Sequence, residues 1–330
     1  MAILGVNYRD GALSVAADRL RREAAERAPG DGPSVVLIHG YKYDPADPRR
    51  SPHGLLYGPA DPLCRLSRRV RSWPAGLGVT PGGPDGLCLG YGWTARRSWL
   101  RTLLTEGRNG FAAAYDEAGR AGAGLVAALD ALAAARSAPV DVLAHSLGAR
   151  VALSALRAAA EAGQADLITR LGRWVLLGPA EFSGQARAAL DACARIGATP
   201  PEIYCFSARH NARYDALFSL FAPLSARDGV PLGLEGLGAA RPRWLDIAFD
   251  HPETPGRLAA RGVRLAAHPE GRACHWGFYL REGAMELHRA ILRRAPGFAV
   301  ADLRAARLPA PAARRNATSP MPDVAEPAAA

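Results

Sequence analysis

The segment from Pro139 to Leu156 constrains the fold of this chain more than any other stretch. A short apolar run, Val140 to Ala144, follows a proline and is typical of a buried strand. The alanine-rich run from Ala149 to Ala160 has helical spacing and ends before Gly163. Ser146 stands between the two runs. The pattern therefore predicts a strand, a sharp turn that carries a serine, and a helix.

Apolar strands and helical runs alternate along the rest of the chain. Strands are expected at residues 2–6 (at an edge), 34–38, 86–90, 140–144, 174–177, 202–207 and 263–267, and helices at 15–27, 111–136, 149–160, 184–195, 208–221 and 284–294. Strands that are apolar on both faces and alternate with helices indicate a mostly parallel sheet. We therefore expect an α/β fold, with a central sheet covered by helices on both faces in a three-layer sandwich.

The length and the local composition favour one large domain over residues 1–308. The chain has 330 residues, of which 49% are hydrophobic, enough for one large core. Two irregular excursions rich in Pro and Gly, at 43–85 and 222–260, interrupt the pattern, and long loops of this kind often cover functional sites. The end of the chain is rich in Pro and Ala without periodicity, so a disordered tail is expected over 309–330.

The net charge of +10 makes nucleic acid a partner to consider. Almost all the basic residues are arginines in scattered pairs, such as Arg21-Arg22 and Arg293-Arg294, and Lys42 is the only lysine. The pairs form no continuous run and do not alternate with aromatic residues. A bias of composition with solvated arginines is therefore favoured, and no nucleic-acid partner is expected. Lys42 also lacks the glycine-rich loop of a phosphate-binding P-loop.

Cofactor and metal sites are not expected either. Gly90-x-Gly92-x-x-Ala95 matches a dinucleotide-binding pattern formally, but Trp93 stands where the backbone would approach a pyrophosphate. The cysteines are odd in number and form no C-x-x-C pair, so they favour neither a disulfide framework nor a zinc site; they are Cys64, Cys88, Cys193, Cys205 and Cys274.

The amino terminus has no basic region and its apolar run is too short for a signal peptide. No stretch of about 18 apolar residues predicts a membrane span. We therefore expect a cytoplasmic protein without a membrane-spanning segment.

Ser146 is a candidate nucleophile. A serine hydroxyl is a weak nucleophile that must project from a rigid backbone toward a base. A strand-to-helix elbow provides this projection, and it aims the next backbone N–H, that of Leu147, at the reacting oxygen. The alternative is that Ser146 simply caps the following helix.

The sequence A-H-S-L-G at 144–148 resembles the nucleophile elbow of the α/β-hydrolase family, with Ala144 in place of the first glycine of G-x-S-x-G. A second similarity is the His39-Gly40 pair after the strand at 34–38. In the family this position supplies the second amide of the oxyanion hole, which implies that the N–H groups of Tyr41 and Leu147 hold the oxyanion. The alternative is an ordinary turn in which His39 holds the loop.

The third similarity is His275, which precedes Trp276 and lies between the last expected strand and the final helix. The family places its catalytic residues in the order serine, acid, histidine. The resemblance therefore implies that His275 is the base that takes the Ser146 proton and later returns it. Packing of a His-Trp pair in the core is the alternative.

The acid of such a triad is expected after the strand at 202–207. Asp215 is the nearest carboxylate and is our choice, although it lies some distance from the strand end. Glu181 after the preceding strand, Asp250 in the second excursion, and Asn211 as a neutral orienting group stay open.

The resemblance extends over about residues 2–295 as an order of strands and helices. It implies a serine hydrolase that acts without a cofactor on a small-molecule acyl substrate, a carboxylic ester by default and a thioester or amide as further options. The alternative is a non-catalytic ligand-binding protein of the same fold, because a fold does not by itself determine a function.

Overall fold

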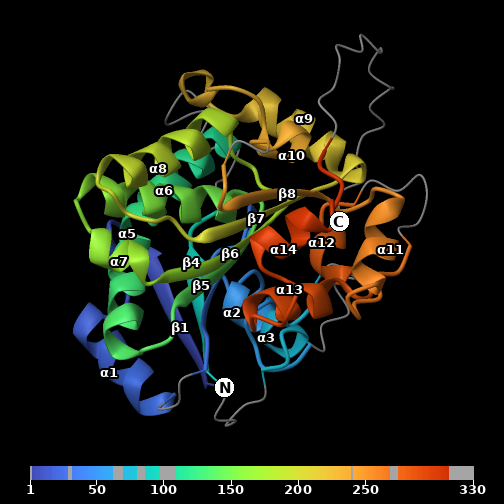
Figure 1. The fold of residues 1–330 in the computed structure, drawn as a ribbon. Coiled ribbons are helices and arrows are strands. Elements are labelled where there is room, and N and C mark those ends of the chain that lie inside the picture. Colours follow the sequence, from blue (N-terminus) through green and yellow to red (C-terminus); the bar gives the residue numbers. More distant parts are fainter. Residues whose placement is uncertain are drawn as a thin grey trace.

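A central sheet of eight strands organises the protein in the computed structural model, which describes residues 2–28, 32–61, 70–79, 86–96, 109–238, 241–267 and 274–311 (Figure 1). The strand order is β2-β1-β4-β3-β5-β6-β7-β8. All neighbouring strands are parallel except the β1–β2 pair. The expected α/β class with a mostly parallel sheet is therefore confirmed.

The strands are β1 (Ala2–Arg9), β2 (Ala12–Leu13), β3 (Ser34–Ile38), β4 (Leu87–Trp93), β5 (Val140–His145), β6 (Leu171–Leu177), β7 (Glu202–Ser207) and β8 (Trp244–Ala248). The larger helices are α1 (Ala17–Arg27), α5 (Gly110–Ala135), α6 (Leu147–Glu161), α8 (Ser183–Arg195), α9 (Ala212–Phe221), α11 (Glu253–Ala259), α13 (Ala284–Leu292) and α14 (Val300–Ala305). Shorter ones are α2 (Pro52–Leu55), α3 (Trp73–Gly76), α7 (Ala165–Thr169), α10 (Leu232–Glu235) and α12 (Gly277–Leu280), with the 3-10 turns η1 (Arg209–Asn211) and η2 (Leu224–Ala226).

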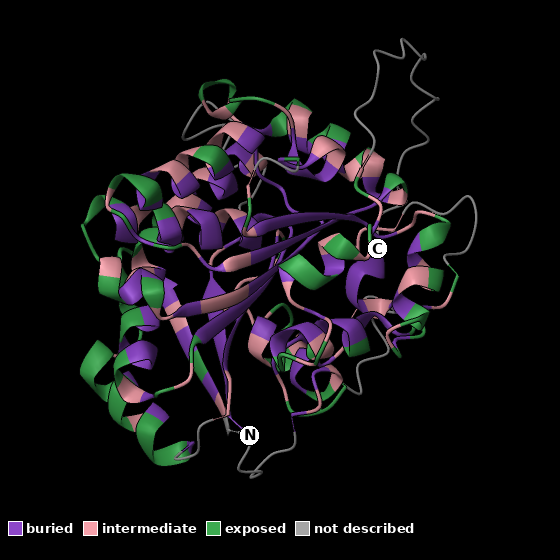
Figure 2. Ribbon diagram, viewed as in Figure 1, coloured by how far each residue is buried: buried purple, intermediate pink, exposed green. Residues whose placement is uncertain are grey.

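Helices cover both faces of the sheet, as the apolar strands predict. Val36 and Ile38 of β3 pack into a core formed with α1, α5, α6 and α8, whereas Val35 and Leu37 pack into a second core formed with α3, α13 and α14. Successive side chains of a strand point to opposite faces, so one apolar strand supplies both cores. Figure 2 shows the buried residues running through the sheet and along the inner sides of the helices.

The last strand lies elsewhere than the sequence predicts. Residues 263–267 form no strand, although Val263 and Leu265 are buried in the second core. The eighth strand is Trp244–Ala248, inside the excursion 222–260 that was expected to be irregular. Asp246 obscures its apolar pattern, but the Asp246 carboxylate accepts hydrogen bonds from Trp244 Nε1 and from the backbone N–H of Leu237. A buried carboxylate is tolerated when it is satisfied in this way.

The other expected strands and helices are found within a few residues of their expected bounds. The excursion 43–85 carries α2 and α3, and the part of it at 62–69 and 80–85 lies outside the described residues. At the end of the domain, the N–H of Ala248 donates to the carbonyl of Pro309 at 2.6 Å, so the chain still contacts the sheet there. The tail was predicted over 309–330, and its residues 312–330 lie outside the described residues.

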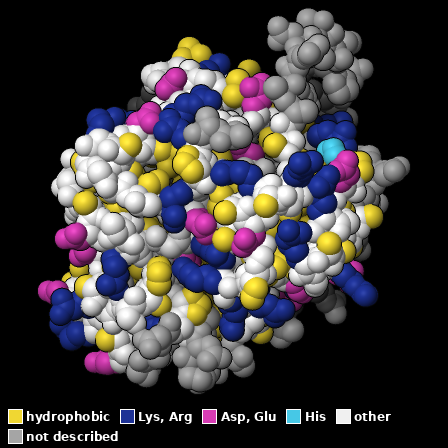
Figure 3. Space-filling view, viewed as in Figure 1, with side chains coloured by type: hydrophobic (Ala, Val, Ile, Leu, Met, Phe, Trp, Pro, Cys, Tyr) yellow, Lys and Arg dark blue, Asp and Glu magenta, His cyan; other side chains and the backbone are white. Residues whose placement is uncertain are grey.

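Helix α5 is long and apolar enough to cross a membrane by length and composition alone. Half of the 18-residue apolar stretch in α5 is buried inside the protein, where α5 packs against α1 and α6. Core helices of globular proteins have the same properties. Arginines are dispersed over the surface, and Figure 3 shows Lys and Arg side chains interspersed with Asp and Glu on the visible face.

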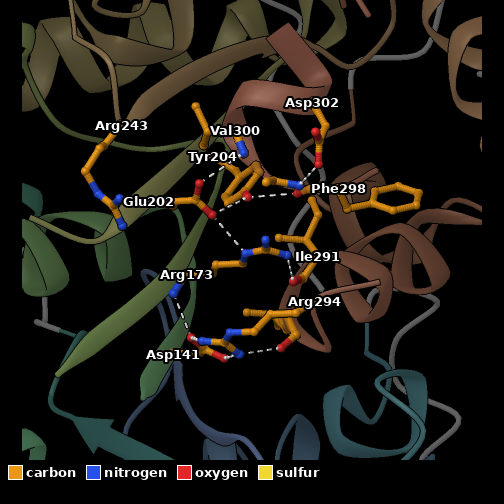
Figure 4. A network of polar contacts seen from close by, with 12 residues as sticks. Asp141, Arg173, Glu202, Tyr204, Arg243, Ile291, Arg294, Phe298, Val300 and Asp302 are labelled. Carbon is orange, nitrogen blue, oxygen red and sulfur yellow. Dashed lines mark hydrogen bonds and ion pairs between the residues drawn. The ribbon is translucent and has the colours of Figure 1, made fainter. Parts of the chain in front are cut away.

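A polar network around the buried Asp141 carboxylate joins the sheet to the C-terminal helices, at the end of β5 remote from Ser146 (Figure 4). Arg294 donates two hydrogen bonds of 2.8 Å to Asp141, whose side chain is fully buried. The backbone N–H of Arg173 donates to the same carboxylate, and the Arg173 guanidinium continues to Glu202 at 2.9 Å. The network therefore fixes the segment after α13 against β5, β6 and β7.

Candidate active site

Ser146 occupies the junction between β5 and α6 in a conformation that serine rarely adopts. Its φ and ψ angles are 56° and −123°, and its left-handed φ is unfavourable for any residue with a Cβ. Two backbone contacts hold it: its N–H donates to the carbonyl of Leu177 at 2.9 Å, and its carbonyl accepts from the N–H of Ala180 at 3.1 Å. The Ser146 hydroxyl makes no capping hydrogen bond to α6, so the reading of Ser146 as an ordinary helix cap is wrong.

Close backbone packing around Ser146 explains the small residues on both sides of the elbow. A Cβ added to Gly40 would lie 2.7 Å from the Cβ of Ser146, and one added to Gly148 would overlap the carbonyl oxygen of Ile38. Ala144 is fully buried and fits where the family has glycine. The end of β3 and the elbow therefore approach each other as closely as the side chains allow.

The two proposed oxyanion amides lie on either side of this contact, since Tyr41 follows Gly40 and Leu147 follows Ser146. No backbone carbonyl among the described residues accepts a hydrogen bond from the N–H of Tyr41 or of Leu147. Leu147 is also the first residue of α6, where the helix dipole adds a partial positive charge. Both N–H groups therefore remain available to an anionic oxygen.

His39 holds the loop that carries Tyr41. The ring lies parallel to Trp93, with 5.4 Å between centroids, and its Nε2 accepts a hydrogen bond from the Trp93 N–H. Its Nδ1 donates to the carbonyl of Gly40 at 2.9 Å. Burial lowers the pKa of His39 to about 3, so the ring is neutral. His39 therefore holds the backbone at Gly40, directly before Tyr41.

The imidazole of His275 contacts Asn211 rather than Asp215, the residue chosen from the sequence. Nδ1 of His275 lies 2.7 Å from Oδ1 of Asn211, and Nδ2 of Asn211 donates to Oδ1 of Asp215 at 3.0 Å. Because Oδ1 only accepts, Nδ1 carries the proton and Nε2 keeps a lone pair. Asn211 ends the turn directly after β7, whereas Asp215 lies a turn further along on α9. Among the described residues, the Asn211 amide therefore links Asp215 to the ring.

The two other carboxylates considered from the sequence belong to separate clusters. Glu181 accepts hydrogen bonds from Tyr115 at 2.5 Å and from Arg150 at 2.8 Å. Asp250 accepts from the backbone N–H of His210 at 3.2 Å. In the described part of the chain, neither carboxylate hydrogen-bonds to His275.

Two residues that sequence reasoning did not single out hold His275 in place. The His145 ring lies 4.5 Å from that of His275, and its Nε2 donates to the His275 carbonyl at 3.0 Å. The Tyr214 ring stacks on the His275 ring, with 4.7 Å between centroids. Burial lowers the pKa of His145 to about 4, so it acts as a neutral donor. The only signal of His145 in the sequence was its place beside Ser146.

Burial also lowers the pKa of His275 well below its ordinary value of 6.5, and the adjacent His145 lowers it further. The structure places His275 against His145, the residue before Ser146. Among the described residues, no hydrogen bond joins the Ser146 hydroxyl to His275. Catalytic hydrogen bonds of this kind are often long without substrate and shorten when it binds.

Two surface hollows among the described residues have linings that do not include Ser146 or His275. One of about 360 Å³ is lined by Tyr8, Asp44 and Arg120, and one of about 610 Å³ by Arg261, Glu286 and Arg293, among others. Within the described ranges, no group of three His, Cys, Asp or Glu side chains could hold a metal ion.

Comparison of the chain with protein-family models, with curated protein sequences and with solved structures finds no match.

Proposed function

We propose that this protein is a serine hydrolase of the α/β-hydrolase fold that cleaves an acyl bond, by default that of a carboxylic ester. The observation that carries the proposal is the left-handed backbone of Ser146 at the carboxyl end of β5, with its hydroxyl free of any capping role. Strain of this kind persists only where the surroundings impose it, and it is common at active sites. The position also agrees with the rule that ligands of parallel sheets bind beyond the carboxyl ends of the strands.

The reaction begins when the Ser146 oxygen attacks the acyl carbon and transfers its proton to Nε2 of His275. The oxyanion that forms accepts hydrogen bonds from the N–H groups of Tyr41 and Leu147. The intermediate expels the alcohol, which takes the proton from His275 and leaves an acyl group on Ser146. Water then repeats both steps, releasing the acid and restoring the serine.

The Asn211–Asp215 pair supports the base in this scheme. Asn211 accepts the Nδ1 proton and thereby fixes the tautomer in which Nε2 is the base. When His275 becomes cationic, the Asn211 amide transmits the stabilising charge of Asp215 through its own hydrogen bond. Papain-like proteases use an amide in the corresponding position.

A non-catalytic ligand-binding protein of the same fold is the second candidate. It is favoured by the absence, among the described residues, of a hydrogen bond between the Ser146 hydroxyl and His275. In that case the elbow would be a structural element, and the site would bind a ligand without turning it over.

Labelling with a fluorophosphonate probe separates the two candidates, because such probes react only with an activated serine. We expect stoichiometric labelling that Ser146→Ala abolishes, together with loss of p-nitrophenyl ester hydrolysis. Ser154→Ala is the matched control, since Ser154 lies on α6 and is half-buried. An unlabelled wild-type protein, or a Ser146→Ala variant with full activity, would leave the binding protein as the better account.

A further inference from the structure

Among the described residues, the large hydrophobic side chains that are exposed are concentrated in one short segment. In the described part of the chain, the large hydrophobic side chains that stand exposed are Leu217, Leu220, Phe221 and Leu224, with exposed fractions of 48%, 62%, 39% and 79%. All four fall within eight consecutive positions. Single exposed leucines are ordinary, whereas a cluster of this kind marks an interaction site.

We call these four residues the α9 face. Their spacing places Leu217, Leu220 and Phe221 on one side of α9, and Leu224 begins η2 after the extended residues Ala222 and Pro223. The opposite side of α9 is already covered, since Phe218 lies 4.6 Å from Phe182 and 6.2 Å from Phe111 between ring centroids. Burial of α9 in the core therefore does not explain the α9 face.

Positive charge predominates around the α9 face. Arg209, Arg213 and Arg227 are exposed there, whereas Asp228 is the exposed carboxylate and Asp215 is buried against Asn211. The Arg209 side chain is 78% exposed, although its guanidinium also lies 4.0 Å from the Asp250 carboxylate. Exposed apolar side chains with arginines beside them can contact an anionic lipid surface through both kinds of side chain.

The α9 face adjoins the candidate active site. Tyr214, three positions before Leu217 on the same helix, stacks on the His275 ring. Figure 1 shows α9 on the outside of the molecule, at the top of the view. A surface that binds the α9 face would therefore lie beside His275.

We propose that the α9 face docks on an anionic lipid surface and so presents acyl lipids to Ser146. An anionic surface satisfies both features of the face, because it attracts the arginines and accepts the apolar side chains. A second copy of this chain would bring two arginine-flanked faces together, and like charges oppose that contact. Docking itself does not require catalysis, whereas the delivery of substrate rests on the proposed function.

Vesicle flotation tests the docking directly. We expect the wild-type protein to float with vesicles of phosphatidylcholine that contain phosphatidylglycerol, to bind pure phosphatidylcholine weakly, and to lose binding as salt rises from about 0.01 M to about 1 M. The triple variant L217Q/L220Q/L224Q should bind roughly tenfold or more weakly, because three apolar side chains leave the interface. These side chains are exposed, so the variant should keep the wild-type melting temperature.

A charge-matched pair isolates the arginines. R209Q/R213Q should weaken binding to the anionic vesicles several-fold, whereas R21Q/R22Q, an equal charge change on exposed residues of α1, should leave it nearly unchanged. Equal losses in the two variants would show that only net charge matters and would overturn the role of the α9 face. Docking would also be contradicted if the wild-type protein did not bind anionic vesicles, or if the triple variant bound them as well as the wild type. A wild-type dimer that becomes monomeric in the triple variant would instead assign the α9 face to a second copy of the chain.

Hydrolysis of soluble p-nitrophenyl acetate distinguishes failure of docking from failure of the proposed function. The triple variant should retain this activity while it loses vesicle binding. A protein that binds the vesicles but hydrolyses the ester equally well with Ser146→Ala would retain the docking surface and lose the proposed mechanism.

Discussion

Nδ1 of His275 donates a hydrogen bond of 2.7 Å to Oδ1 of Asn211, so an amide stands where a carboxylate was expected. The carboxylate of Asp215 lies one hydrogen bond further from the His275 ring, because it accepts from the Asn211 amide. A neutral partner stabilises the cationic imidazole less than an adjacent carboxylate does. This arrangement and the burial of His275 both favour a neutral ring.

The amide should matter more to catalysis than the acid behind it. Asn211→Ala removes the acceptor that fixes the tautomer of His275, and we expect kcat to fall by roughly 10² to 10⁴. Asp215→Asn keeps that acceptor, so a loss of roughly tenfold is expected from the missing charge. Steady-state kinetics with a p-nitrophenyl ester measure both. A larger loss for Asp215→Asn than for Asn211→Ala would contradict the order of contacts.

The double variant N211D/D215N exchanges the amide and the carboxylate. It places a negative charge beside His275, so the pKa of the ring should rise and the acid limb of kcat/KM should move to higher pH than in the wild type. The variant should also recover activity relative to either single substitution. An acid limb that does not move would show that position 211 does not contact the catalytic base.

The wild-type pH profile should reflect the lowered pKa of His275. The base must be unprotonated, and burial lowers its pKa well below 6.5. Activity should therefore persist as pH falls below 6.5, and the acid limb should appear only at lower pH. Initial rates that give kcat/KM between about pH 4 and pH 8 locate this limb. The stability of the protein is checked at each pH. An acid limb at or above 6.5 would mean that another group is the base.

Gly40 should tolerate no side chain. The Cβ of Gly40→Ala would lie 2.7 Å from the Cβ of Ser146, so we expect a destabilisation of about 1–3 kcal/mol and a loss of activity as the elbow shifts. Gly54→Ala is the control, because a Cβ there meets nothing within 4 Å. Thermal unfolding and ester hydrolysis measure the two effects. Equal stability and activity of the two variants would show that the backbone at Gly40 can move away from Ser146 without cost.

Buried histidines should make the fold sensitive to acid. Burial lowers the pKa of His39 to about 3 and that of His288 to about 4, against 6.5 when unfolded. The unfolded chain therefore binds more protons in this window, and the free energy of unfolding should fall as pH falls from about 6.5 to about 4. His288→Gln should reduce this loss by up to about 3 kcal/mol. Urea unfolding at several pH values tests it, and an unchanged slope in the variant would contradict the assignment.

The polar network at the other end of β5 should contribute to the free energy of unfolding. Arg294→Met leaves the carboxylate of Asp141 buried without its ion-pair partner, and we expect a loss of about 3 kcal/mol. Arg293→Met at the neighbouring position, which forms no ion pair among the described residues, should change stability by less than about 0.5 kcal/mol. Denaturant unfolding compares them. Similar values for both would show that solvent satisfies Asp141 when Arg294 is lost.

Local patterns in the sequence were enough to predict the parallel sheet, the helices on both faces and the serine at the turn. Runs of apolar residues, helical spacing and a proline or glycine at each end act over a few neighbouring positions, so they can be read without tertiary structure. The β8 strand escaped this reading because Asp246 interrupts its apolar run, and only the donors that surround it make its burial possible.

Tertiary structure alone decided which group meets the candidate base. Asn211 and His275 are 64 positions apart in the chain, and His145 and His275 are 130 apart. No local preference encodes a contact over such a separation, because it depends on how η1 follows β7 and on where His275 lies before α12. The sequence by itself determined that Ser146 stands at a strand-to-helix turn. The packing of Gly40, Leu177 and Ala180 around that turn imposed its strained backbone.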